Sequence, residues 1–157
     1  MKIAWVHIAS GREPFAEAAE ALYLQKLSAF FQTEILTIKA KTGEREQAAD
    51  KRRAESAKLL EIFKPDDFVV LFDDKGQAFA DSVEFSKRIV RAIESGKKRL
   101  VLVIGGAFGV DEAVRSRANL LVSLSHLTFN HHVARVVAME QLYRALTIWK
   151  NLPYHNI

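Results

Sequence analysis

The stretch LVLVIGGAFG, from Leu100 to Gly109, decides the expected fold. Its first half, Leu100 to Ile104, is apolar at every position, which is typical of a central parallel strand covered on both faces of a sheet. Its second half is a glycine loop, where the backbone can approach a ligand closely or take a positive φ angle. A short helix is expected after the loop, from Asp111 to Arg117.

The rest of the chain repeats this alternation of strand and helix. Further strands are expected at residues 2–9, 33–38, 68–72 and 120–124. Further helices are expected at residues 13–31, 44–63 and 81–96, and in a last segment that ends at Trp149 and is capped by Thr128 or Asn130. Asp73 to Gly76 is expected to be a turn. Five strands, each followed by a helix, predict one α/β domain over residues 1–157, with a mostly parallel sheet flanked by helices.

The amino-acid composition and the charge limit the kinds of function that the chain can have. The absence of cysteine excludes disulfides, thiolate metal sites and cysteine nucleophiles. The apolar runs are too short for a membrane span, and the first residues read as a strand and not as a signal peptide, so we expect a soluble, cytoplasmic protein. The net charge of +4 favours an anionic partner such as RNA. The basic residues concentrate in two stretches, 39–64 and 87–99.

Ligands of parallel sheets bind beyond the carboxyl ends of the strands. Three segments stand there: Asp73–Gly76, Gly105–Gly109 and Ser123–Asn130. The glycine spacing matches neither a dinucleotide fingerprint nor a P-loop, which disfavours a standard dinucleotide site and an ATPase. The glycine loop could also be a tight turn without a ligand. In the third segment, main-chain groups could clamp a small molecule, with an apolar slot formed by Leu124, Leu127 and Phe129.

No metal site is expected from the five histidines. His131 and His132 are adjacent, so on a helix their side chains diverge by about 100° and cannot easily chelate one ion together. The other histidines show no spacing of a helical metal motif.

The segment before Trp149 is apolar on most of its helical faces, and its main polar interruptions are Arg135, Glu140, Gln141 and Arg144. Glu140 precedes Arg144 by four residues, the favourable order for a helical ion pair. A helix that is apolar nearly all round is buried, and a small domain rarely buries its last helix on every side. We therefore expect a homodimer, in which a partner subunit covers this helix.

Taken together, the C-terminal motifs resemble the RlmH group of SPOUT methyltransferases, which methylate N3 of a pseudouridine in bacterial 23S rRNA. The matching pieces, in order, are Val103–Gly109, Leu124–Phe129, His131–Arg135, Glu140–Ala145 and Pro153–His155. Four positions depart from the family pattern. Phe72 stands where leucine is common, Asn130 where proline is usual, His132 where glutamine is common, and Asn156 where a basic residue usually follows the histidine.

The resemblance implies a SPOUT-type fold with a C-terminal trefoil knot, a homodimer, and S-adenosylmethionine as methyl donor without a metal. The cofactor site would comprise Phe72, Gly105, Gly106, Leu124, Ser125, His126, Leu127, Thr128 and Phe129. His155 with Tyr154 would handle the proton and orient the base. Arg135 or Arg144 would either interact with the charge of the substrate or form an ion pair within the protein. His131 is a further catalytic candidate.

The implied partner is 23S rRNA in a large subunit or an assembled ribosome. Two alternatives stay open at this point. One is a non-catalytic ribosome- or RNA-binding factor with the same fold, and the other is a SPOUT methyltransferase that acts on tRNA.

Overall fold

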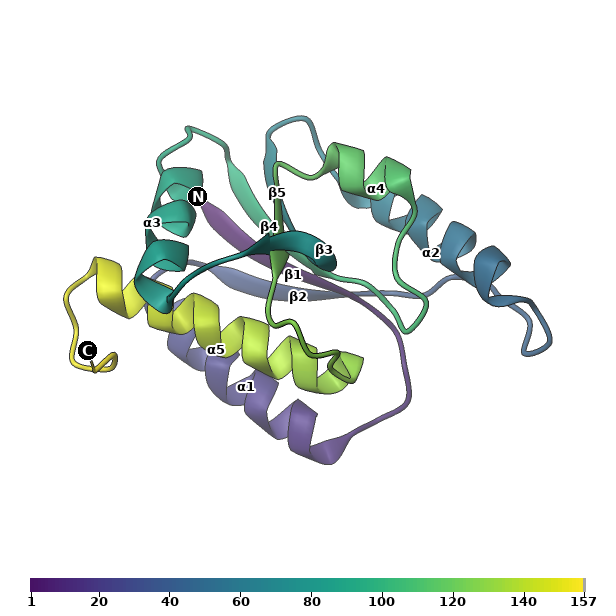
Figure 1. The fold of residues 1–157 in the computed structure, drawn as a ribbon, viewed down its shortest axis with the longest axis horizontal. Helices are drawn as coiled ribbons and strands as arrows, with labels where there is room; N and C mark the ends of the chain where they lie inside the picture. Colours follow the sequence, from purple (N-terminus) through teal and green to yellow (C-terminus); the bar gives the residue numbers. More distant parts are fainter. Residues whose placement is uncertain (157) are drawn as a thin grey trace.

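The computed structural model describes residues 1–156, in which five strands alternate with five helices (Figure 1). The strands are β1 (Lys2–Ile8), β2 (Thr33–Ile38), β3 (Asp67–Ala78), β4 (Arg99–Ile104) and β5 (Leu120–Ser123). The helices are α1 (Pro14–Ser28), α2 (Ala48–Ile62), α3 (Ser82–Ile93), α4 (Glu112–Arg117) and α5 (His131–Trp149).

The strands form one sheet in the order β2-β1-β4-β3-β5, and every neighbouring pair is parallel. The predicted α/β class with a parallel sheet is therefore confirmed. β4 is the central strand, and its residues Leu100 to Val103 are fully buried. The side chains of β4 alternate between two cores, one under α1, α3 and α5 and the other under α2 and α4 (Figure 1). The continuous apolar run was the correct signal for a strand covered on both faces.

The predicted turn at Asp73–Gly76 is wrong. β3 continues in extended conformation to Ala78, and its pairing with β5 shifts register between Phe72 and Gln77, which both lie opposite Val122. The intervening residues form an irregularity in the strand. Gly76 approaches β5 closely, because a Cβ atom there would lie 2.5 Å from the backbone N of Val122. The polar, glycine-containing sequence indicated a turn, whereas the tertiary pairing with β5 restores the strand.

The residues at the starts of α1, α3 and α5 explain where these helices begin. α1 begins at Pro14, whose missing N–H costs nothing in a first turn. The Asp81 side chain caps α3 by accepting a hydrogen bond of 2.8 Å from the N–H of Glu84. The Asn130 side chain caps α5 by accepting one of 2.9 Å from the N–H of His132. Of the two predicted caps for the last helix, Asn130 therefore fills the role.

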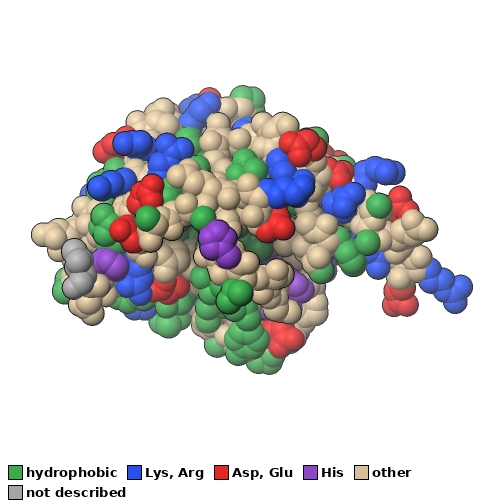
Figure 2. Space-filling view, viewed as in Figure 1, with side chains coloured by type: hydrophobic (Ala, Val, Ile, Leu, Met, Phe, Trp, Pro, Cys, Tyr) green, Lys and Arg blue, Asp and Glu red, His purple; other side chains and the backbone are tan. Residues whose placement is uncertain are grey.

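α5 buries one side against α1 and α3, through Ala138, Met139, Leu142, Ala145 and Leu146. Complete burial of this helix, as the sequence led us to expect, is not reached in a single chain. Val133 is 36% exposed, and nearby on α1 Phe15 and Leu22 are 56% and 48% exposed. Hydrophobic side chains accordingly gather at the lower edge of the molecule, over α1 and the first turns of α5 (Figure 2). We call Phe15, Leu22 and Val133 the α1/α5 apolar face.

Within residues 1–156, no helix is long and apolar enough to cross a membrane.

Candidate functional site

The segments that follow β4 and β5 meet the irregular part of β3 around one cavity of about 810 Å³. It lies at the carboxyl edge of the sheet, where an α/β sheet is expected to bind its ligand. Its walls are residues 72–75, 104–110 and 123–131, with Arg115 and Ala134. The volume is within the range of pockets that enclose a small molecule.

All residues predicted to bind the cofactor line this cavity: Phe72, Gly105, Gly106, Leu124, Ser125, His126, Leu127, Thr128 and Phe129. The apolar slot is only partly built in one chain, because Leu127 is 76% exposed. Serine hydroxyl groups of the segment after β5 form hydrogen bonds within that segment. Ser123 Oγ donates to the carbonyl of Ser125 at 3.1 Å, and Ser125 Oγ accepts from the N–H of Leu127 at 2.9 Å. These bonds fix the shape of the loop that faces the cavity.

The glycine loop is tightly held. The N–H of Gly109 donates to the carbonyl of Gly106 at 3.1 Å, and Gly109 has a φ of 74°, which favours glycine. A Cβ at Gly105 would lie 3.1 Å from the Val110 side chain, and one at Gly106 would lie 2.7 Å from Glu55 Oε2 on α2. The backbone of Gly109 therefore favours glycine, whereas a side chain at Gly105 or Gly106 would displace the Val110 or Glu55 side chain.

α2 supports the far end of the same loop. Ser56, which is buried, accepts a hydrogen bond of 2.9 Å from the N–H of Asp111, and Arg52 Nε donates to the Asp111 carboxylate at 3.0 Å. Arg52 and Ser56 are four residues apart and so share one face of the helix. This face holds the segment between β4 and α4 in place.

His131 stands at the edge of the cavity, in the first turn of α5. Burial lowers its pKa, and the positive charges of His132 and Arg135 lower it further. The ring is therefore neutral at pH 7 and does not repel a cationic ligand in the cavity.

A second cluster lies at the other end of α5. Glu140 Oε1 accepts a hydrogen bond of 2.9 Å from the Tyr154 hydroxyl and another of 3.1 Å from Arg144 Nε. Arg144 Nη1 lies 3.2 Å from His155 Nδ1. Because a guanidinium can only donate, Nδ1 accepts, and the proton of the neutral imidazole is on Nε2. The predicted helical pair Glu140–Arg144 is thus present and extends to both predicted C-terminal residues.

Two groups of this cluster, Tyr154 and Arg144, have raised pKa values. Burial, then hydrogen bonds with Tyr23 and Glu140, raise the pKa of Tyr154, so the phenol stays protonated at neutral pH. The hydrogen bond to Glu140 also raises the pKa of Arg144, which stays cationic. The Tyr154 hydroxyl is therefore a donor to Glu140 in this structure.

The two clusters are far apart in one chain. Arg144 follows His131 by thirteen residues on the same helix, a rise of about 20 Å. Arg135 belongs to neither cluster. Its guanidinium lies 2.6 Å from Glu20 of α1, and the two side chains are 12% and 9% exposed. Of its two predicted roles, the structure places Arg135 in internal pairing.

Two basic residues at the cavity were not singled out from the sequence, although one of them, Lys75, belongs to the predicted ligand segment Asp73–Gly76. Lys75 and Arg115 line it, and Asp73 binds Arg115 Nε at 3.0 Å. Lys75 is in the segment that was interpreted as a turn, and Arg115 is on the short helix α4. Their meeting depends on the irregularity in β3, for which the sequence carries no clear signal.

Comparison with known proteins decides the family. A family model described as predicted SPOUT methyltransferase matches residues 1–155. The chain is 46% identical to the ribosomal RNA large subunit methyltransferase H of Bdellovibrio bacteriovorus, with all of both chains covered. It is 42% identical to the protein of the same name from Nitratidesulfovibrio vulgaris, with 92% of each covered.

The chain belongs to the SPOUT methyltransferase family. The family predicted from the motifs is thereby confirmed. Among solved structures, a probable methyltransferase from Bordetella pertussis shares the SPOUT fold with a TM-score of 0.57 at 14% identity, covering 92% of this chain and 96% of that one. In the described part of this SPOUT chain, no group of three or more His, Asp or Glu side chains is arranged to hold a metal ion.

Proposed function

We propose that this single-domain SPOUT protein is a cytoplasmic, S-adenosylmethionine-dependent methyltransferase that methylates N3 of a pseudouridine in the 23S rRNA of the large ribosomal subunit. One observation carries the proposal: the cavity of about 810 Å³ at the carboxyl ends of β3, β4 and β5 is lined by residues from the first three motifs of the RlmH pattern, Val103–Gly109, Leu124–Phe129 and His131–Arg135. Full-length relatives at 42–46% identity bear the name ribosomal RNA large subunit methyltransferase H.

The cavity suits S-adenosylmethionine. Its glycine loop brings backbone groups to the wall, and Phe72, stacked 6.2 Å from Trp5 between ring centroids, gives it an aromatic floor. Asp73 and Asp74 supply negative charge. Burial would raise the pKa of Asp73, but bonds from the Lys75 N–H and from Arg115 outweigh it and lower that pKa, so this carboxylate stays ionised. When bound, S-adenosylmethionine supplies an electrophilic methyl group on a sulfonium. The protein's task is then largely positioning.

The C-terminal cluster suits the acceptor. N3 of a pseudouridine carries a proton and becomes nucleophilic when that proton leaves, so the site must favour the resulting imide anion. The Arg144 cation and the Nε2–H of His155 are donors for the carbonyl oxygens beside N3. Tyr154 orients this pair through Glu140. His131, neutral at the rim of the donor cavity, is the candidate to accept the N3 proton.

A homodimer would bring the donor cavity of one chain close to the C-terminal cluster of the other. Because about 20 Å of α5 separates His131 from Arg144, one chain does not bring donor and acceptor groups together. A second copy packed on the α1/α5 apolar face would cover exposed Phe15, Leu22 and Val133 and would bring its own C-terminal cluster to the donor cavity. The trefoil knot stays a prediction from the family resemblance.

Methyl transfer from radiolabelled S-adenosylmethionine tests the proposal against its alternatives. Separated large subunits, assembled ribosomes, bare 23S rRNA and tRNA are offered in parallel, and the modified nucleoside is identified by mass. Label in a 23S pseudouridine is expected. Label in tRNA alone would favour the tRNA alternative. No label, together with no heat of binding at millimolar donor, would favour a non-catalytic RNA-binding factor.

A further inference from the structure

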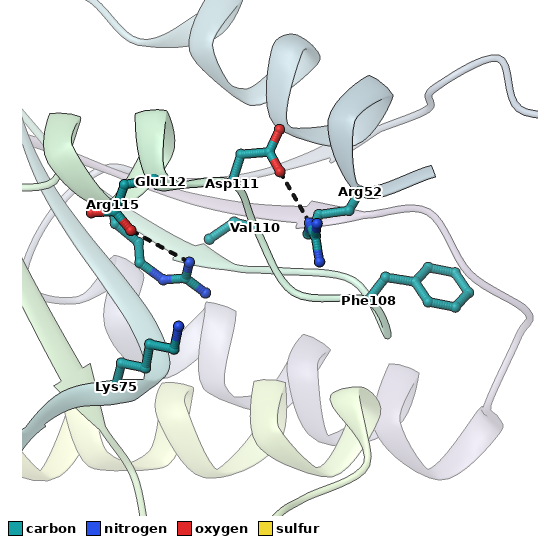
Figure 3. A pocket seen from close by; sticks show the side chains of 7 residues that line it. All are labelled: Arg52, Lys75, Phe108, Val110, Asp111, Glu112 and Arg115. Carbon is teal, nitrogen blue, oxygen red and sulfur yellow. Dashed lines mark hydrogen bonds and ion pairs between the residues drawn. The ribbon is translucent and has the colours of Figure 1, made fainter. Parts of the chain in front are cut away.

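A second cavity of about 260 Å³ adjoins the donor cavity and carries three cationic side chains. They are Arg52 of α2, Lys75 of β3 and Arg115 of α4 (Figure 3). Lys75 and Arg115 line both cavities, as does Phe108 of the glycine loop. The small cavity is therefore a side chamber of the donor site, built by elements from three parts of the chain.

Both guanidinium groups of the side chamber are held by their Nε atoms. Arg115 Nε donates to Asp73 at 3.0 Å, and Arg52 Nε donates to Asp111 at 3.0 Å. The Arg115 guanidinium points toward the ammonium of Lys75 across the chamber, although Nη1 of Arg115 also lies 3.7 Å from Glu112 (Figure 3). Arg115, fixed through its Nε, is therefore pre-organised for an anion that Lys75 can reach from the other side of the chamber.

Lys75 is the cation of the side chamber that is left for an anion. Arg52 is bonded to Asp111, and Arg115 is bonded to Asp73 and lies near Glu112. Within residues 1–156, the Lys75 ammonium forms no ion pair, so it can meet the single negative charge of a phosphodiester group.

Phe108 adds an aromatic surface at the mouth of the chamber. Its side chain is 41% exposed, and Lys51 Nζ lies 5.6 Å from the centre of its ring. It belongs to neither of the two buried cores. An exposed aromatic ring among cations is the combination with which proteins stack a base of single-stranded RNA while holding its backbone.

We propose that the side chamber binds one phosphate of the RNA substrate through Lys75 and Arg115, and that a neighbouring base stacks on Phe108. This fixes the strand beside the donor cavity and sets which nucleotide reaches the methyl group. The inference rests on the proposed function in taking that RNA to be 23S rRNA.

The test compares Lys75→Ala and Phe108→Ala with Lys64→Ala, a control at the opposite edge of the sheet whose side chain is exposed. Affinity for large subunits is measured over a range of salt concentrations, and affinity for S-adenosylmethionine is measured by calorimetry. Lys75→Ala is expected to weaken RNA binding and to lower the slope of log affinity against log salt by about 0.7, the value for one single-strand phosphate contact. Lys75→Arg is expected to restore most of that slope.

Phe108→Ala is expected to weaken RNA binding about fivefold or more while the salt slope stays unchanged, because stacking is not ionic. Donor affinity is expected to change much less than RNA affinity in both variants. Thermal unfolding of each variant confirms that it is folded.

Three results would overturn the inference: unchanged RNA binding in both variants, an equal loss in Lys64→Ala, or a loss of donor affinity in Lys75→Ala as large as its loss of RNA affinity. The last would assign the chamber to the donor. The proposed function fails separately, if the wild-type protein binds subunits but transfers no methyl group. The salt slopes still decide the inference in that case.

Discussion

At the scale of single residues, the Glu140 carboxylate links the groups that the sequence proposed for catalysis. It accepts from Tyr154 and from Arg144, and Arg144 in turn holds His155. The spacing of Glu140 and Arg144 was enough to predict their pair. The connection to Tyr154 and His155 needs the chain to turn back after α5, which no local pattern specifies.

We expect Glu140→Gln to lower the rate of methyl transfer about 10²-fold, because Arg144 and His155 lose the anionic group that orients them. Donor affinity should fall much less than the rate, since Glu140 is not among the residues that line the donor cavity. Single-turnover kinetics and calorimetry measure the two effects. Glu61→Gln, which removes an exposed carboxylate paired with Lys58 on α2, is the matched control. Equal rates in both variants would contradict the role given to Glu140.

His7 gives a pH prediction. Burial, with the charges of Arg135, His132 and His131, lowers its pKa from 6.5 to about 4. Below pH 6.5 the unfolded chain takes up a proton at this ring and the folded chain does not, so stability falls as the pH drops from 6.5 to 4 and is unaffected above. Because the ring is partly exposed, we expect a loss of about 1 to 2 kcal/mol.

Urea unfolding of the wild type and of His7→Gln at pH 7 and pH 4.5 measures this effect. The variant should lose less stability between the two pH values than the wild type. An equal loss would show that His7 is protonated in the folded protein as easily as in the unfolded one.

At the scale of elements, β4 and β3 show what the sequence can predict. The uninterrupted apolar run of β4 indicated a central strand, and it is one. The residues after Phe72 contain two aspartates, a lysine and a glycine, a composition typical of turns, yet β3 continues to Ala78. The pairing with β5 overrides this local preference. Because β5 lies about fifty residues later in the chain, a short stretch of sequence around β3 cannot reveal this pairing.

Gly76 is the residue on which that pairing depends. We expect Gly76→Ala to destabilise the protein by about 2 to 4 kcal/mol, because its Cβ would meet the Val122 backbone at 2.5 Å and neither strand can move freely. Gly11→Ala, where a Cβ meets nothing within 4 Å, is the control. Chemical denaturation of both variants gives the difference. Similar stabilities would mean that the strands separate there without cost.

The donor cavity was predictable at this scale because its parts are the ends of consecutive strands. The glycine loop and the segment around Ser125 could be placed together from the parallel sheet alone. The side chamber was not predictable, since Arg52, Lys75 and Arg115 come from elements whose contacts arise only in the folded chain.

At the scale of the whole molecule, the α1/α5 apolar face is left uncovered in a single chain. Phe15 and Leu22 are seven residues apart on one side of α1, and Val133 is exposed on α5, which packs against α1. We expect the wild type to sediment as a dimer and Leu22→Glu to shift it toward monomer, because a carboxylate in a buried apolar seam is desolvated without a partner. Leu60→Glu, on α2 and 37% exposed, should leave the dimer intact. A monomeric wild type at micromolar concentration would contradict this assembly.

In the proposed dimer, one protomer's donor cavity works with the other protomer's C-terminal cluster. Mixing two inactive variants measures this directly. Gly106→Trp introduces a side chain that would collide with Glu55 and displace the glycine loop of the donor cavity, and Arg144→Ala removes the cation proposed to bind the RNA base. After subunit exchange at equal concentrations, half of the dimers are mixed and each has one complete site, so the account predicts about a quarter of wild-type methyl transfer. If the mixture stays as inactive as its components while subunit exchange is complete, donor and acceptor groups belong to the same chain and the account is wrong.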